Sequence, residues 1–133
     1  MRAIRVLVML AAAVALLAPA GCSDNTLAPF QPEISNVTDN FQLQATGVTG
    51  RTASLNYNWT NTGTVALVNH STTTSAGSAR VVIHDAAGVL VYNEALVPSL
   101  NEPTIAGTAG TWTIQLVLDG YSGTLNFRVQ KST

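Results

Sequence analysis

The sequence has only one cysteine in 133 residues, and this scarcity excludes an internal disulfide bond. Charged residues are also few, at 10% of the chain, and aromatic residues make up only 6%. After position 21, four basic residues remain against all seven acidic ones, a net charge of about −3. Nucleic-acid binding depends on many Lys and Arg contacts to phosphate, so this balance argues against a nucleic-acid partner.

Long apolar runs are scarce too, and the one that is present lies near the amino terminus. Val6 to Ala18 is an uninterrupted apolar stretch of thirteen residues that follows Arg2 and Arg5. A membrane-spanning helix needs about 20 residues, so this run is too short to cross a bilayer. A basic flank, a short apolar core and then small residues are the order of a secretory signal peptide. We therefore expect residues 1–21 to be a helical signal peptide.

The residues Ala20-Gly21-Cys22 place the single cysteine directly behind this signal. The segment resembles a bacterial lipoprotein signal, in which the cysteine thiolate, a strong nucleophile, is alkylated by diacylglycerol. The resemblance implies that the mature chain begins at lipidated Cys22. Ser23 to Pro32 has two prolines and no period, which predicts an extended tether, so residues 22–33 are expected to be the lipidated terminus and tether. It also implies a lipid-anchored protein of the bacterial cell envelope, and Ser23 implies the outer membrane if the organism has two membranes. The alternative is an incidental free thiol beside an ordinary cleavage site.

The remainder of the chain alternates apolar and polar residues with a period of 2, which is typical of half-buried β-strands. Inward rows are expected at Phe41 to Ala45, Ala53 to Trp59, Trp112 to Leu118 and Leu125 to Val129. No segment after the tether has a 3.6-residue period long enough for a helix. The predicted strands are NFQLQAT (40–46), TASLNYNW (52–59), VALVN (65–69), ARVVIH (79–84), VLVYN (89–93), TWTIQLVL (111–118) and TLNFRVQ (124–130).

Turn signals separate these runs. Asp85-Ala86-Ala87-Gly88 has Asp first and Gly fourth, which favours a type I turn and predicts a hairpin over 79–93. Asp119 to Gly123 predicts a second hairpin, between the last two strands, and Asn61-Thr62-Gly63 predicts a link from Trp59 to Val65. In this interpretation Asp85 stabilises its own turn, and we expect Asp85→Asn to be mild.

Seven or eight short strands in about 100 residues indicate an all-β domain over 34–133. The expected fold is a two-sheet antiparallel β-sandwich, either a jelly roll or immunoglobulin-like. From Arg80 to Gln130 the order of strands and Gly turns resembles bacterial extracellular jelly-roll or immunoglobulin-like modules, such as pre-peptidase C-terminal domains. That resemblance implies a fold and no activity.

Catalytic and metal-binding patterns are weak. His84 adjoins Asp85, but neighbours along a strand point to opposite faces, so the two side chains are poorly placed to chelate one ion. His70 is the only other histidine. No G-x-S-x-G elbow or comparable nucleophile motif occurs. We therefore expect no enzyme activity, no cofactor and no metal ion.

Aromatic side chains suggest the sharper hypothesis. Tyr121, Trp59 and Tyr92 could contact a ligand by stacking on sugar rings if they lay on one outer face. Trp59 continues an inward row, so core packing is favoured for it, whereas Tyr121 lies in Gly-flanked sequence and is expected to be the most exposed.

Two functions remain open from the sequence. The favoured one is a non-catalytic envelope lipoprotein whose sandwich is a binding or structural module for a protein or cell-wall partner, since edges and loops bind partners without chemistry. The alternative is a carbohydrate-binding module.

Overall fold

The structure is a computed structural model that describes residues 30–133, and all regular secondary structure in this range is β-strand. The predicted signal peptide, the predicted lipidation site Cys22 and most of the predicted tether lie outside the described residues. No helix in the described range is long and apolar enough to cross a membrane. The strands are β1 (Glu33–Val37), β2 (Asn40–Asn61), β3 (Ala66–His70), β4 (Thr73–His84), β5 (Leu90–Ala95), β6 (Leu100–Pro103) and β7 (Gly110–Lys131).

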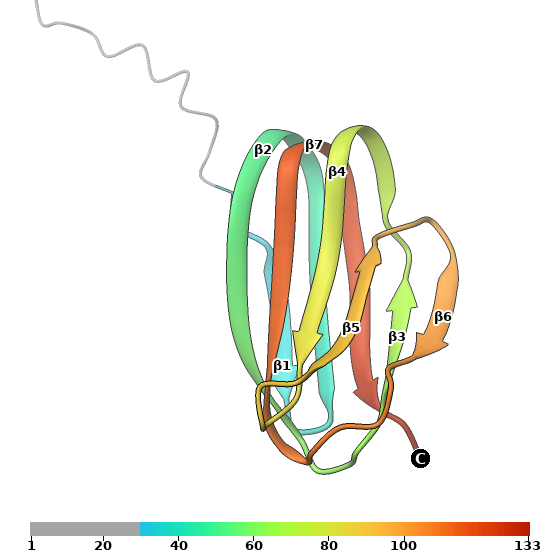
Figure 1. Ribbon diagram of the computed structural model, residues 1–133. Helices are drawn as coiled ribbons and strands as arrows, with labels where there is room; N and C mark the ends of the chain where they lie inside the picture. The colour runs from blue at the N-terminus through green and yellow to red at the C-terminus, as the bar shows by residue number, and fades with distance from the viewer. Residues whose placement is uncertain (1–29) are drawn as a thin grey trace, which may run out of the picture.

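Two long strands build both layers of the fold. β2 and β7 have 22 residues each, pair antiparallel along their length and bend midway, so each contributes one half to each layer (Figure 1). The first layer has the order β1, first half of β2, second half of β7, β3, β6. The second layer has the order second half of β2, first half of β7, β4, β5. The predicted all-β antiparallel sandwich is confirmed.

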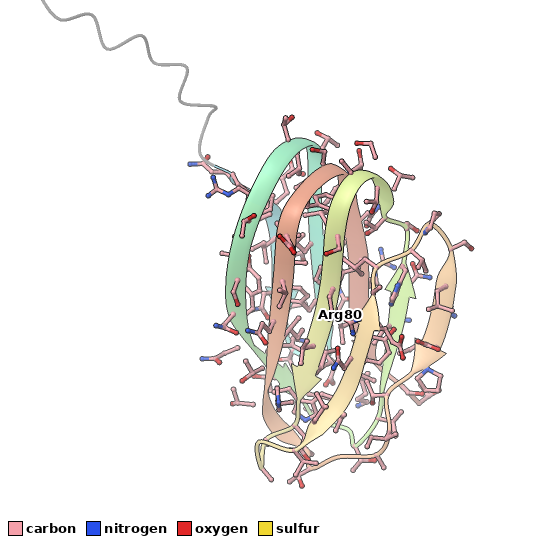
Figure 2. The ribbon with its side chains drawn as sticks, turned by 45° about the horizontal axis from the view of Figure 1, so that its top comes forward. Arg80 is labelled. Carbon is pink, nitrogen blue, oxygen red and sulfur yellow. The ribbon has the colours of Figure 1, made fainter. Side chains whose placement is uncertain are left out.

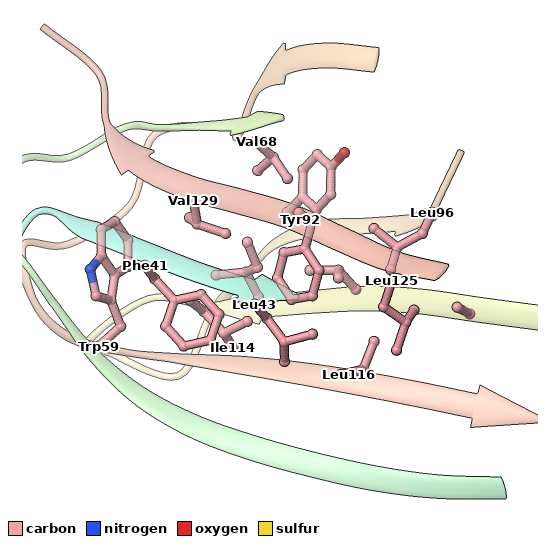
Figure 3. Packing of buried hydrophobic residues seen from close by; sticks show 14 of the residues in the cluster. Phe41, Leu43, Trp59, Val68, Tyr92, Leu96, Ile114, Leu116, Leu125 and Val129 are labelled. Carbon is pink, nitrogen blue, oxygen red and sulfur yellow. The ribbon is translucent and has the colours of Figure 1, made fainter. Parts of the chain in front are cut away.

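The core lies between the layers, where the inward rows of the sequence meet (Figure 3). Phe41 and Leu43 of the first layer are fully buried, as are Trp112, Ile114 and Leu116 of the second. Full burial of one such side chain contributes about 1.5–3 kcal/mol. Alternation therefore predicted these faces correctly, and the polar residues between them lie on the outside. Figure 2 shows one of these, Arg80, on the outer face of β4.

The hairpin predicted over 79–93 is confirmed. The Gly88 N–H donates to the Asp85 carbonyl at 3.0 Å, and Gly88 has φ 79°, a backbone conformation that residues with a side chain rarely adopt. The predicted link after Trp59 is also present, with the Gly63 N–H donating to Asn61 Oδ1 at 2.9 Å.

The second predicted hairpin, at Asp119 to Gly123, is wrong. The chain does not reverse there but continues as β7 and crosses from the second layer to the first. The reason is that β2 and β4 flank this segment on both sides and bend with it, with register shifts in both neighbours. We call this bend the arch, formed by residues 46–52 of β2, 73–77 of β4 and 119–123 of β7. Likewise, the predicted strands 40–46 and 52–59 are halves of one strand.

Two short strands were not predicted. β1 is exposed along its whole length, and β6 contains Glu102 and Pro103, so neither has an alternating pattern. Both lie at edges of the first layer and pair with one neighbour only. The described chain enters the fold at the arch end, whereas the carboxyl terminus lies at the opposite end (Figure 1).

Candidate functional site

The three aromatic residues proposed from the sequence lie in the core. Trp59 is 1% exposed, Tyr92 is 6% exposed and Tyr121 is fully buried. The predicted exposure of Tyr121 is therefore wrong, because the crossing of β7 turns this ring inward under the arch. There its hydroxyl donates to the Thr73 carbonyl at 2.9 Å. These rings therefore offer no exposed stacking face.

Tyr92 nevertheless reaches the wall of an open depression, which we call the edge groove. It lies between β5 and β6, where the edges of the two layers meet, and has a volume of about 300 Å³. Val89, Leu90 and Ile105 are exposed at or near it, although they are large and apolar. The lining residues are Leu90, Val91, Tyr92, Asn93, Glu94, Glu102, Pro103 and Ile105.

A chain of three polar side chains runs from this groove into the core. The Tyr92 hydroxyl donates to Glu102 Oε1 at 2.9 Å, and His70 Nε2 lies 2.6 Å from the Tyr92 oxygen. Because the tyrosine proton is used by Glu102, the Nε2 of His70 must be the donor to the tyrosine oxygen. These hydrogen bonds join β3 and β6 of the first layer to β5 of the second, and so connect the two layers along this side.

Burial sets the ionisation of these groups. Desolvation lowers the pKa of His70, despite the opposing influence of Glu102 and Glu94, which favours the neutral imidazole. Desolvation also raises the pKa of Tyr92, and the hydrogen bond to Glu102 raises it further. The Nδ1 of His70 is buried and has no hydrogen-bond partner. In this hydrogen-bonded set the histidine and the tyrosine are therefore both neutral. The only hydroxyl bonded to the imidazole is the phenol of Tyr92.

The other polar residues weighed from the sequence do not form a metal site. His84 ends β4, and the adjacent Asp85 is occupied by the turn and by a nearby loop. Asp85 Oδ1 accepts from the N–H groups of Ala87 and Val89, and Oδ2 accepts from the N–H of Thr108. Within residues 30–133, no three His, Cys, Asp or Glu side chains are grouped closely enough to hold a metal ion.

A larger cavity lies at the arch end, beside the point where the described chain begins. We call it the arch cavity; its volume is about 440 Å³, within the range of roughly 300–1,000 Å³ typical of ligand pockets. One wall comes from residues 30–33 before and within β1, and the other comes from the arch segment of β2. The lining residues are Phe30, Gln31, Glu33, Gln44, Ala45, Thr46, Gly47, Val48, Thr49 and Arg51.

The arch cavity combines one aromatic ring, one cation and several neutral polar groups. The Arg51 guanidinium lies 5.8 Å from the centre of the Phe30 ring, a distance at which a cation–π contact is favourable. Glu33 supplies one negative charge and Arg51 one positive charge, so the lining is neutral overall. The arch itself is held by polar contacts, among them the Gly50 N–H donating to Ser122 Oγ at 2.8 Å.

Sequence reasoning missed this cavity for identifiable reasons. Phe30 lies between two prolines in a segment interpreted as tether, and Arg51 lies between two predicted strands. Their proximity depends on β1 pairing with the first half of β2, and β1 has no alternating pattern. The sequence did contain a weak indication of a binding site, since Phe30 is a large ring and Arg51 a cation, each among mostly small or polar residues.

The sequence matches no protein-family model and no curated protein. Among solved structures, the chain is similar to the C-terminal CBM6 of LamC, a marine laminarinase from Zobellia galactanivorans. The similarity covers 77% of this chain and 88% of that chain, at 10% sequence identity and a TM-score of 0.37. Similarity at this level implies no shared function.

Proposed function

We propose that this chain is a non-catalytic binding module, anchored to the bacterial cell envelope by lipid on Cys22, whose ligand is a neutral glycan bound in the arch cavity. The observation that carries the proposal is the chemistry of that cavity. It offers one aromatic ring and several neutral polar side chains on a lining with no net charge, in a volume suited to a small ligand.

Each part of the lining matches a feature of a sugar. The amides of Gln31 and Gln44 and the hydroxyls of Thr46 and Thr49 are donors and acceptors for ligand hydroxyls. Arg51 adds a fork of donors beside the ring of Phe30. Because the lining has no net charge, it favours a neutral ligand over an ionic one.

The predicted anchor and the cavity lie close together along the chain. Eight residues lead from Cys22 to Phe30, which at full extension span at most about 26–29 Å. A lipid on Cys22 therefore keeps the arch cavity within this distance of the membrane surface. The expected ligands are glycans that lie near an envelope membrane.

A glycan array followed by calorimetric titration tests the proposal. The protein should bind at least one neutral glycan, and Arg51→Ala and Phe30→Ala should each weaken binding about tenfold or more. Arg80→Ala is the matched control, since Arg80 lies on the outer face of β4, and it should leave affinity unchanged. Absence of glycan binding, or equal losses in Arg51→Ala and Arg80→Ala, would refute glycan binding in the arch cavity.

A protein partner is the second candidate, and the edge groove is the observation that favours it. Val89, Leu90 and Ile105 are between 45% and 64% exposed beside the carboxylates of Glu94 and Glu102. Such a surface suits a partner that presents apolar and basic side chains together. Cross-linking in cells that depends on Ile105 and not on Arg51 would favour this function over the glycan-binding one.

A further inference from the structure

The second half of β2 is the outer strand of the second layer. From Ala53 to Asn61 it pairs with β7 in regular register, and no other strand of residues 30–133 pairs with this half. On its other side, the backbone N–H and C=O groups therefore pair with no other strand of the described chain.

The hydrogen bonds at the end of this strand show which backbone groups point outward. The Asn58 carbonyl accepts from Asn36 Nδ2 at 2.8 Å, and the Thr60 carbonyl accepts from the Asp39 N–H at 2.9 Å. Neither carbonyl is bonded to the β7 residues that pair with this half of β2, so the even-numbered residues direct their backbone outward. In an antiparallel strand the N–H and C=O of one residue point to the same side. Ser54 and Asn56 therefore direct one donor and one acceptor each into the open edge.

The part of this edge from Thr52 to Tyr57 lacks the features that protect sheet edges, whereas Asn36 and Asp39 already occupy the outward carbonyls of Asn58 and Thr60. Proteins guard exposed edges with short strands, charges or proline. β1 has five residues and includes Glu33, β6 has four residues with Glu102 and Pro103, and β5 has six residues with Glu94. By contrast, the open residues from Thr52 to Tyr57 include no charge and no proline.

The inward side of the same edge is incompletely covered. Leu55 and Tyr57 are only partly buried, whereas their partners on β7, Leu116 and Ile114, are fully buried. The difference arises because no strand of the second layer lies beyond β2. A strand added at this edge would cover the apolar surface that Leu55 and Tyr57 leave exposed.

We propose that a second copy of this chain occupies the edge, with its own β2 lying antiparallel to this one. The result is a two-fold dimer in which the two second layers form one continuous sheet, and each surface patch meets itself. A second copy has an open edge of matching length, and since neither edge is charged from Thr52 to Tyr57, no like charges face each other there. Such a dimer needs no lipid anchor and no glycan, so it stands apart from the proposed function.

The oligomeric state of the full chain tests this proposal. The protein is expressed in a bacterial host, purified in mild detergent, and its protein mass is measured by light scattering with absorbance and refractive-index detection. We expect a dimer for the natural sequence. Asn56→Lys should raise the dimer dissociation constant at least tenfold, because it brings like charges together at the facing edges.

Ser78→Lys is the matched control, since it adds the same charge at an exposed position of β4 and should remain dimeric. Ser54→Lys is a second edge variant, and circular dichroism and thermal unfolding identify any variant that fails to fold. A monomer at concentrations of about 100 μM, near the weak end of specific association, would overturn the proposal. So would a folded Asn56→Lys or Ser54→Lys protein that dimerises as well as Ser78→Lys.

Discussion

At the scale of single residues, the buried aromatic side chains show how polar atoms are accommodated in this core. Trp59 Nε1 donates to the Val37 carbonyl at 3.1 Å, and Trp112 Nε1 donates to the Thr108 carbonyl at 2.7 Å. The two indoles also meet edge to face, with ring centres 5.9 Å apart. Each ring therefore contributes apolar area and also holds a neighbouring segment, the end of β1 for Trp59 and the loop before β7 for Trp112.

The first prediction concerns Trp112, which is fully buried. Trp112→Ala should lower the free energy of unfolding by about 3–5 kcal/mol, since it removes a large core side chain and leaves a cavity. Thr113→Ala is the control at the next position, on the opposite face of β7, and should cost far less. Urea unfolding followed by circular dichroism measures both, and equal small losses would contradict the burial of the indole.

The second prediction concerns Asp85, whose carboxylate receives three backbone N–H groups. The hydrogen bond from Thr108, then those from Val89 and Ala87, hold the pKa of Asp85 below its ordinary value of 3.8. A lowered pKa in the folded state means that the carboxylate stabilises the fold above about pH 4. That contribution is lost as pH falls through the lowered pKa.

Asp85→Asn should therefore lower the melting temperature at pH 7, because an amide has one acceptor oxygen where the carboxylate has two. The difference from the natural protein should shrink as the pH falls below 4 and through the lowered pKa of Asp85. From the sequence alone the effect is expected to be mild, because Asp85 is assumed to stabilise only its own turn. The additional hydrogen bond from Thr108 is the reason to expect a larger loss of stability. Thermal unfolding between pH 7 and pH 3 measures this, and a constant difference would contradict it.

At the scale of elements, the arch decides the shape of the molecule. β7 crosses between layers at Gly120 to Gly123. The next inward residue after Leu118 is Tyr121, three positions later, whereas regular alternation would place it two positions later. An extra residue of this kind is a β-bulge, which bends a strand without ending it. β4 follows the same bend at Gly77, where its backbone approaches that of β7 closely.

The third prediction is that Gly77→Ala destabilises the fold severely. A Cβ atom at Gly77 would lie 2.3 Å from the carbonyl oxygens of Asp119 and Gly120, and φ there is 67°. Gly47→Ala is the matched control, because φ is 63° but nothing lies within 4 Å of the added atom. The control should cost only about 1 kcal/mol from backbone strain. Thermal unfolding that ranks the two variants equally would contradict the close approach at the arch.

At the scale of the whole molecule, the domain combines one folded sheet with an amino-terminal segment whose sequence predicts lipidation. The described chain begins beside the arch cavity, so the chain enters the sandwich at the end that holds this cavity. One lipid chain alone anchors a protein only weakly, and the two or more chains of a lipoprotein anchor it durably.

The fourth prediction concerns this anchor. Mass spectrometry of the mature protein should find Cys22 as the first residue, with the mass of a diacylglyceryl group added. Cys22→Ala should block this processing and move the protein out of the lipid-anchored membrane fraction. A mature terminus at another residue, without lipid, would contradict the envelope localisation.

The sequence by itself determined the strand class, the inward rows and the Asp85 to Gly88 hairpin, because these depend on local alternation and on turn residues a few positions apart. Only the tertiary structure decided that Asp119 to Gly123 is a crossing, that Tyr121 is buried, and that Phe30 lies beside Arg51. A bend and a hairpin use the same glycines, and the choice between them depends on which strands lie alongside. At the bend those neighbours, β2 and β4, pair with residues of β7 that are more than 40 positions away in the chain, a separation that local patterns do not encode.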